Sequence, residues 1–352
     1  MARPTRPPAN AFVFQLRKVY NPIGFSHGYN FVLFVIFFGA LLGFSLSRLM
    51  YLDFDGVFCA ASEPAALPSE CFFYKNNVEK FGIILHLVAI LPGSILACWQ
   101  FVPAIRHKAI ILHRINGYIV ILLSLASTAG VLMITRHAAG GSLETQAGLG
   151  LLSIMFVASL LLAFINIKRL QIEQHRAWML RAWFYAGSII TLRLIQIVSA
   201  ILLSSIGKFQ AARRCDLLEY LVEDVNKTRE LYPACEPYFL GQNVNQHAVV
   251  DADFTHPSSA AEAAVALEIS FGMALWIALA VHAVGVEIYL HLTPAEANRI
   301  RHFSYKRQLE AGMKHPGRAG ITSDRIGDAV IWNPEDKNQH PKSKGGLEAA
   351  QA

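Results

Sequence analysis

The sequence predicts an all-α fold, a polytopic membrane helix bundle with six transmembrane helices around a four-helix core. The first observation is composition: 54% of the 352 residues are hydrophobic and only 16% are charged. A soluble domain is typically about 45–50% apolar and about 25% charged. The second observation is a mean hydropathy of +0.37. Together they exclude a disordered chain, a collagen-like or coiled-coil rod and a small disulfide knot.

The apolar residues are gathered in six runs, each long enough to cross a bilayer. A span needs about 20 mostly apolar residues, and hydrocarbon does not tolerate unpaired backbone amides, so each run is expected to be a helix. A soluble all-helical protein is the alternative, but six runs of this length would not share one soluble core. The predicted spans are Phe31–Leu52, Phe81–Pro103, Ile115–Thr135, Thr145–Ile167, Ala182–Gly207 and Ala263–Leu290.

The segments between the spans differ in charge, and this difference predicts the orientation. One side carries 21 Lys/Arg against 8 Asp/Glu, and the other carries 8 against 15. Basic loops remain in the cytosol, so both termini are predicted to be cytosolic. The cytosolic segments are 1–30, 104–114, 168–181 and 291–352. The membrane domain is 31–290, with its core at 81–207 and outer loops at 53–80, 136–144 and 208–262.

Cysteines and a glycosylation sequon agree with this orientation. Four cysteines lie in the outer loops, where an oxidising compartment allows disulfides: Cys59, Cys71, Cys215 and Cys235. Pairing within each loop and pairing between the loops both remain open. Cys98 lies in the second span and is expected to be a small core residue. Asn226 begins an Asn-Lys-Thr acceptor on the outer side. We therefore expect a glycoprotein of the endomembrane system or the plasma membrane.

The two ends of the chain carry different signals. The first span has no compact signal-peptide layout before it and is interpreted as an uncleaved anchor. After the last span, Thr293-Pro294-Ala-Glu296 forms a capping box that predicts a short helix to about Ala311. The remainder, to residue 352, is expected to be mostly disordered. The lipid bilayer explains the basic charge, so nucleic acid is not needed as a partner.

Arg193 is the charged residue placed deepest in a predicted span. A cation there costs at least about 2.5–3.5 kcal/mol, so it should face a polar interior and have a partner. Gln196 lies one turn further on, whereas no acidic residue of another span is expected at the same depth. Two interpretations remain: a structural arginine that bonds backbone carbonyls, or an anchor for an anionic ligand or cofactor group.

Histidines near the span ends suggest a b-type haem. Bis-histidine ligation needs one imidazole from each of two facing helices. His86 with His137 on the outer side, and His113 with His175 on the inner side, are the predicted pairs, and His282 and His291 are spare inner candidates. The alternative is that these histidines contact lipid headgroups or cap helix carbonyls. No metal site other than haem iron is predicted.

Residues 81–206 resemble a predicted integral-membrane family known only as a domain of unknown function, found in bacteria and filamentous fungi. The resemblance implies a four-helix core with two extra spans and no settled activity. Tyr118 stands where the family usually has Arg, and His137 is outside its pattern. The matching residues are His86, Gly93, Gln100-Phe101, Arg106, His113-Arg114-Ile-Asn-Gly117, Gly140-Gly141, His175-Arg176-Ala-Trp178-Met179-Leu-Arg181 and Thr191-Leu192-Arg193.

Three functions follow from these residues. The leading hypothesis is a haem-containing or quinone-interacting membrane redox protein, in which the histidines are ligands or proton carriers and Arg193 holds a propionate or an anionic substrate. The first alternative is a membrane enzyme on prenyl or terpenoid lipids, such as a cyclase, with Glu268, Glu287 or a loop carboxylate as the acid. The second is a transporter or scaffold without catalysis. A small hydrophobic or quinone-like ligand is the expected partner.

Overall fold

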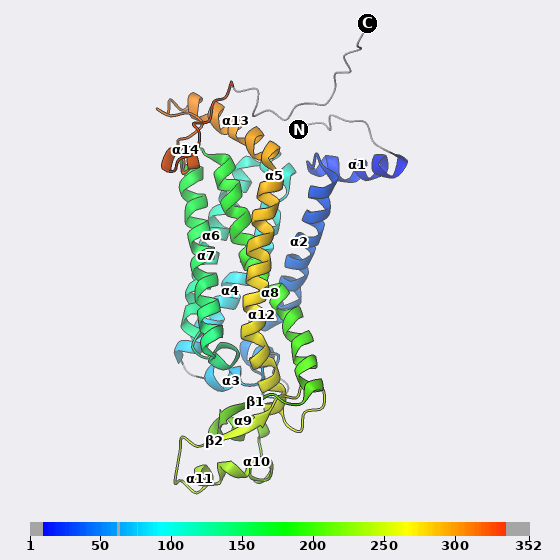
Figure 1. Ribbon diagram of the computed structural model, residues 1–352, viewed down its shortest axis with the longest axis vertical. Coiled ribbons are helices and arrows are strands. Elements are labelled where there is room, and N and C mark those ends of the chain that lie inside the picture. Colours follow the sequence, from blue (N-terminus) through cyan, green and yellow to red (C-terminus); the bar gives the residue numbers. More distant parts are fainter. Residues whose placement is uncertain (1–9, 62–63, 76, 336–352) are drawn as a thin grey trace. The chain divides into compact units, whose positions relative to one another are not determined.

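The computed structural model describes residues 10–61, 64–75 and 77–335 (Figure 1). The predicted all-α polytopic bundle is confirmed, because the described residues contain six helices long and apolar enough to cross a membrane. They are α2 (Gly28–Ser47), α4 (Asn77–Gln100), α6 (Ile110–Ile134), α7 (Leu143–Lys168), α8 (Ile172–Ile206) and α12 (Ala260–Leu292).

The helix boundaries differ from the predicted spans, and two of the differences are at the end of α2 and the start of α8. The helix of the first span, α2, ends at Ser47, because Arg48 has φ −104° and ψ 0° and the chain continues as the 3₁₀ helix η1 (Leu49–Leu52). In α8 the helix begins at Ile172, ten residues before the predicted span. Hydropathy marks only the apolar part of a helix, so it does not detect the polar turns that precede Ala182.

The chain divides into two compact units. The first comprises the described residues up to 153 together with 187–279, and the second comprises 154–186 and the described residues from 280 onward. In the first unit α4 and α6 approach closely at two glycines. A Cβ on Gly130 would lie 2.5 Å from the carbonyl oxygen of Gly82. Only glycine permits this backbone approach.

The outer loops of the first unit are closed by two disulfides. Cys59 pairs with Cys71, and Cys215 pairs with Cys235. The predicted disulfide bonding is confirmed, and the open choice of pairing is resolved in favour of bonds within each loop. Cys98 is free and buried. The first disulfide joins the end of η2 (Phe54–Phe58) to α3 (Glu70–Phe73).

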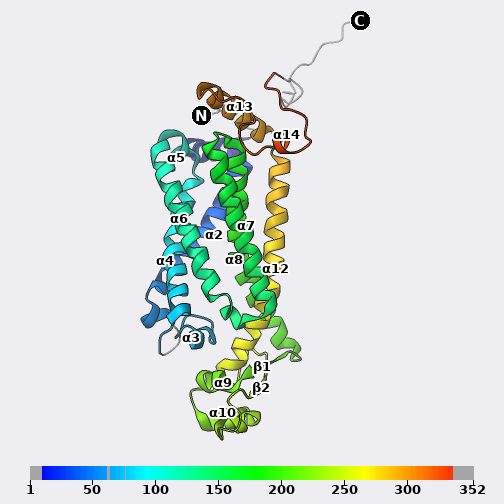
Figure 2. The ribbon, with the colours of Figure 1, turned by 90° about the vertical axis from the view of Figure 1, so that its left-hand side faces the viewer.

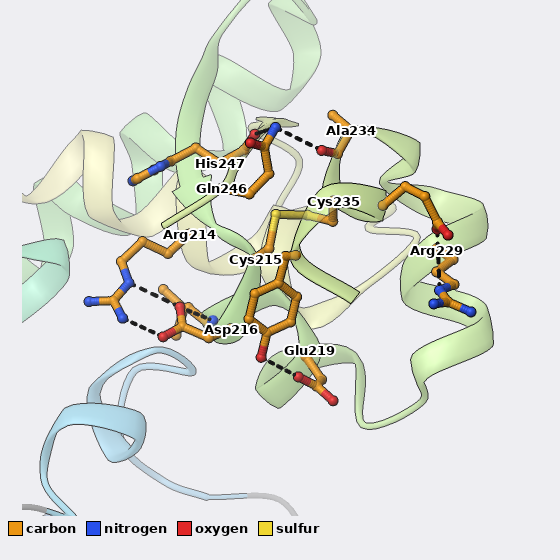
Figure 3. Close-up of a disulfide and its surroundings, with 12 residues drawn as sticks. Arg214, Cys215, Asp216, Glu219, Arg229, Ala234, Cys235, Gln246 and His247 are labelled. Carbon is orange, nitrogen blue, oxygen red and sulfur yellow. Dashed lines mark hydrogen bonds and ion pairs between the residues drawn. A yellow bond between two sulfur atoms is a disulfide. The ribbon is translucent and has the colours of Figure 1, made fainter. Parts of the chain in front are cut away.

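The second outer loop forms a small disulfide-linked layer that the sequence does not predict. Its two strands are antiparallel, and the Cys215–Cys235 disulfide joins the first helix after β1 to η4 (Figure 3). Figure 2 shows its strands and helices gathered beyond the N-terminal end of α12. Its elements are β1 (Gln210–Arg214), α9 (Cys215–Val222), α10 (Val225–Leu231), η4 (Pro233–Cys235), α11 (Glu236–Phe239) and β2 (His247–Asp251).

Side-chain bonds fix this layer around the disulfide. Arg214 pairs with Asp216, and Gln246 Nε2 donates to the Ala234 carbonyl at 2.9 Å (Figure 3). The Tyr238 hydroxyl donates to Glu219 at 2.7 Å, and this bond, with burial, raises the pKa of Tyr238 to about 12. The bonded loop therefore presents an ordered surface, on which Asn226 is exposed.

The second unit holds the C-terminal segment, part of which was expected to be disordered. The helix α13 (Pro294–Glu310) ends close to the predicted Ala311. Residues 312–335 include α14 (Ser323–Ile326) and are anchored, because the Gly320 amide donates to Gln171 Oε1 at 2.8 Å and Arg301 pairs with Asp324. The expectation of disorder differs from the structure over this stretch. Its remaining part, 336–352, lies outside the described residues.

Candidate functional site

Two buried carboxyl groups lie near the outer end of the first unit, and we call Glu70 and Glu268 the acid pair. Glu70 begins α3 and is 9% exposed, and Glu268 lies in the third turn of α12 and is 2% exposed. The 3₁₀ turn η3 (Ala138–Gly141) contacts both. The Ala139 amide donates to Glu70 Oε1 at 3.1 Å, and a Cβ on Gly140 would lie 2.8 Å from Glu268 Cδ. This turn therefore holds the two carboxyls near each other.

Glu268 has ionic and hydrogen-bonding partners from two different loops. Arg213 Nε donates to its Oε2 at 3.0 Å, and a second Arg213 nitrogen contacts the same oxygen. The Ser69 hydroxyl donates to the other carboxylate oxygen. A buried carboxylate needs such compensation for the loss of water. Glu268 is therefore held as an ion-paired carboxylate.

Glu70 has a different environment. Burial raises the pKa of the Glu70 carboxyl, and the negative charge of Glu268 raises it further, while the charge of Arg193 and the amides of Ala139 and Leu67 oppose the shift. The net direction is upward, so Glu70 retains a proton to higher pH than an ordinary glutamate. The acid pair thus consists of one ion-paired carboxylate and one carboxyl that favours the protonated form, the arrangement that separates acid from base roles.

Tyr74 extends the pair. Its side chain is almost completely buried. Burial, and then the negative charge of Glu70, raise the pKa of Tyr74 well above its usual value. The phenol therefore stays neutral.

Arg193 contacts Gln196 on its own helix and Phe271 on α12. Its Nη1 donates to Gln196 Oε1 at 3.0 Å, and its guanidinium carbon lies 5.3 Å from the ring centroid of Phe271. Gln196 in turn donates to the Leu267 carbonyl at 3.0 Å and so links α8 to α12. The positive charge of Arg193 acts to lower the pKa of Glu70. The sequence misses this interaction because Glu70 comes from a loop and not from another span.

Aromatic residues stand next to Glu70 in the chain. Phe72 and Phe73 directly follow Glu70 and Cys71. Phe72 packs on Tyr220 at 5.4 Å and Phe73 on His137 at 4.4 Å between ring centroids, and Tyr74 packs on Phe58 at 6.3 Å. Aromatic faces stabilise nearby positive charge.

The predicted histidines contact separate neighbours. His86 Nδ1 lies 2.9 Å from Ser127 Oγ on α6, and His137 Nδ1 lies 3.2 Å from Glu79 Oε1 on α4. Since Glu79 and His86 are seven residues apart on α4, the two histidines contact that helix at points about 10 Å apart along its axis.

The inner histidines belong to different units. His113 lies at the start of α6 in the first unit, and its carbonyl accepts from Gln100 at 3.1 Å. His175 lies in the second unit, where its Nδ1 is 3.0 Å from the Ala163 carbonyl oxygen. Within the described part of the chain, no group of three or more His, Cys, Asp or Glu side chains is arranged to hold a metal ion.

The second predicted acid, Glu287, lies in the second unit and is engaged elsewhere. Arg181 Nε and Nη2 donate to its two oxygens at 2.6 and 2.9 Å. The nearby His291 and His282 each place Nδ1 by a backbone carbonyl, of Glu287 at 2.8 Å and of Phe184 at 2.7 Å. Glu287 therefore forms a bidentate ion pair with Arg181.

Four residues of this site, Ser69, Glu70, Tyr74 and Arg213, are absent from the sequence-based candidates. All lie in outer loops. One signal in the sequence points to them: Ser69 and Glu70 immediately precede Cys71, and Arg213 precedes Cys215 by two residues. A half-cystine fixes the backbone next to it, so polar residues beside a disulfide are candidates for a fixed site.

The comparison with known proteins covers much of this region. Residues 83–222 match the family described as "Predicted membrane protein (DUF2306)". The resemblance predicted from the sequence is confirmed over this DUF2306 segment. It contains Arg193 and Arg213, whereas both carboxyls of the acid pair lie outside it.

A curated fungal protein is also similar to the chain. "Ava biosynthesis cluster protein G" of Aspergillus versicolor is 24% identical over 336 residues, which cover 83% of this chain and 97% of that protein. No solved structure matches the chain.

Proposed function

We propose that this chain is a membrane-bound enzyme that performs acid–base chemistry on a hydrophobic substrate, with Glu70 as the proton donor. The observation that carries the proposal is the division of roles in the acid pair. Glu268 is neutralised by Arg213, while Glu70 is buried with a raised pKa. A general acid works best when its pKa is raised toward the working pH.

The reaction proposed is a cyclase-like isomerisation of a prenyl or terpenoid lipid. The Glu70 carboxyl transfers its proton to an alkene carbon or an epoxide oxygen, and the resulting carbocation is captured by a double bond of the same molecule. Loss of a proton from the cyclised cation to the Glu70 carboxylate restores the acid. Atoms and electrons balance without an oxidant or reductant. Arg193 stabilises the Glu70 carboxylate between the two proton transfers.

Two further observations support this proposal. The aromatic rings beside Glu70 suit a cationic intermediate. The name of the fungal relative assigns that protein to a biosynthesis cluster, which favours an enzyme over a scaffold. In this proposal both termini are cytosolic, and the acid pair faces the lumen or the exterior.

The test uses farnesylated phenols and their terminal epoxides as probes. Membranes from cells that produce the chain are incubated with each probe, and the products are separated by mass spectrometry. The expected product has the mass of the probe and one new carbocycle, which replaces a double bond of the phenol probe or the oxirane ring of the epoxide probe. Glu70→Gln should lower its formation by at least about a hundredfold, since it removes the general acid. Glu230→Gln, an exposed residue of α10, is the matched control and should retain activity.

Two results would refute the proposal. One is full activity of Glu70→Gln. The other is the absence of any isomer from both probe classes with wild-type protein that is monodisperse in detergent.

A b-type haem protein is the second candidate function, and one observation favours it. His86 places Nδ1 against the carbonyl and hydroxyl oxygens of Ser127, at 3.3 and 2.9 Å. Haem-type and other metal-ligating histidines commonly use one ring nitrogen in this way and present the other to the metal. The Soret band of purified protein tests this candidate directly.

A further inference from the structure

The N-terminal helix α1 (Ala11–Ile23) is amphipathic and leaves an apolar face uncovered. Phe12, Leu16 and Val19 are 69%, 37% and 54% exposed. Their spacing of four and three residues places them on one face of the helix. The sequence predicts only a cytosolic segment here and gives this face no role.

One aromatic side chain fixes the rotation of α1. Tyr20 is buried, and its ring lies 5.7 Å from that of Phe31 on α2. The joint between the helices is also specific. Gly24 has φ +102°, and a Cβ there would lie 3.0 Å from Pro103 Cβ at the start of α5 (Pro103–Lys108). The exposed face of α1 is therefore held in a defined direction.

The position of α1 brings this face to a bilayer surface. In Figure 1, α1 lies across the N-terminal end of α2 and does not extend along the axis of α2. The apolar side chains of α2 just beyond the joint are exposed as well, among them Val32, Val35 and Ile36. Since α2 is a membrane span, these side chains face lipid. The exposed apolar residues of α1 are thus followed in the chain by the exposed, lipid-facing residues of α2.

Charge selects the lipid. The first 52 residues contain no Asp or Glu, and the first acidic residue of the chain is Asp53. In α1 the basic residues Arg17 and Lys18 lie on either side of the helix away from the apolar face, and Lys18 Nζ is 4.8 Å from the ring centroid of Phe14. Long basic side chains beside an apolar stripe reach the phosphates of anionic headgroups while their stems remain in the apolar boundary.

We propose that α1 lies in the plane of the adjacent leaflet, with Phe12, Leu16 and Val19 inserted below the headgroups and Arg17 and Lys18 bound to anionic phospholipid. The occupant of the exposed face is therefore the lipid surface. This proposal does not depend on the proposed acid–base activity.

The test measures the depth of single positions. Cysteine is introduced at Leu16 or Val19, and at the exposed Ala11 as the matched control, since its spacing of seven residues places it on the side of Lys18. Each is labelled with an environment-sensitive fluorophore in the full chain. Cys98, the free native cysteine, is buried, so the unmodified chain reports the background labelling. Each variant is placed in nanodiscs that hold one copy, of phosphatidylcholine alone or mixed with phosphatidylserine.

Labels at positions 16 and 19 should be quenched several-fold more by nitroxide-bearing lipid than the label at 11, and phosphatidylserine should strengthen the difference. The double substitution Arg17→Gln with Lys18→Gln should remove the effect of phosphatidylserine. Equal access of an aqueous quencher to all three positions would overturn the proposal. Protection that appears only in vesicles holding several copies would overturn it too, because a second copy would then cover the face.

Discussion

Replacing Arg301 by Met is expected to release the segment 313–335 from the rest of the second unit. Arg301 Nη2 donates to both Asp324 oxygens at 2.7 Å, and its Nε donates to the Gly317 carbonyl at 3.0 Å. Its guanidinium carbon also lies 5.0 Å from the ring centroid of Trp332. The substitution leaves Asp324 buried without its cation.

The magnitude follows from burial. The Arg301 and Asp324 side chains are 16% and 1% exposed, so solvent screens this pair little. Removing one partner of a buried ion pair costs about 3–5 kcal/mol. At 1.4 kcal/mol per tenfold change, the opening equilibrium of the segment should rise roughly a hundred- to a few-thousand-fold.

The pH dependence has a defined sign. Burial alone would raise the pKa of Asp324, but the hydrogen bonds from Arg301 and from the Trp332 amide, with the charge of Arg301, lower it to about 2. The ordinary value is 3.8, so the pair stabilises the docked segment fully above that pH and loses its contribution as the pH falls toward about 2. Arg301→Met should remove most of this acid dependence.

Amide hydrogen exchange measures the release. The Gly317, Gly320 and Ile321 amides donate to Gln308, Gln171 and Asn166, so their exchange reports opening of the segment. Arg299→Met is the matched control, because its ion pair with Glu296 is exposed and should contribute less than about 1 kcal/mol. Unchanged exchange in Arg301→Met, or equal acceleration in both variants, would refute the reasoning.

Three further predictions concern the outer side and the histidines. Gly140→Ala should destabilise the chain by about 1–3 kcal/mol in thermal unfolding, because φ is +79° and the new Cβ would meet Glu268, whereas Gly150→Ala meets nothing within 4 Å and should not. Asn226→Gln should abolish a glycosidase-sensitive mass shift in protein from eukaryotic cells; an insensitive wild-type protein contradicts the outer placement of that loop. If haem is bound, His86→Ala should bleach part of the Soret band, and a colourless preparation from haem-replete cells rejects the redox candidate.

The six spans could be predicted because a membrane imposes length and composition on each helix separately. The boundaries of the helices could not be predicted where polar residues extend a helix beyond its apolar run. The α8 helix starts at Ile172, and the sequence there is polar. Likewise, the polar segment after Ala311 has the composition of a disordered tail. It is ordered up to residue 335 because residues such as Gln171 and Gln308 satisfy one another and the backbone of the segment.

The candidate site shows the same division. Glu268 and Arg193 could be selected from the sequence because a charge inside an apolar run is unusual. Glu70 could not, because its burial depends on contacts between residues far apart in the chain. Ser69 and Glu268 are separated by 199 positions, and Ala139 and Glu70 by 69. No local pattern encodes such contacts.

The infrared spectrum of the chain in lipid nanodiscs, recorded as the pH is raised, tests the central claim most directly. The account predicts the carbonyl band of a protonated carboxylic acid that persists above the ordinary glutamate pKa of 4.5. Glu70→Gln should remove part of this band, so that the wild-type minus Glu70→Gln difference spectrum contains it. In Glu268→Gln the Glu70 contribution should remain and titrate at lower pH, because the negative charge that helps to raise the pKa of Glu70 is gone. An unchanged band in Glu70→Gln, or a wild-type spectrum without any such band, would contradict the assignment of Glu70 as the acid.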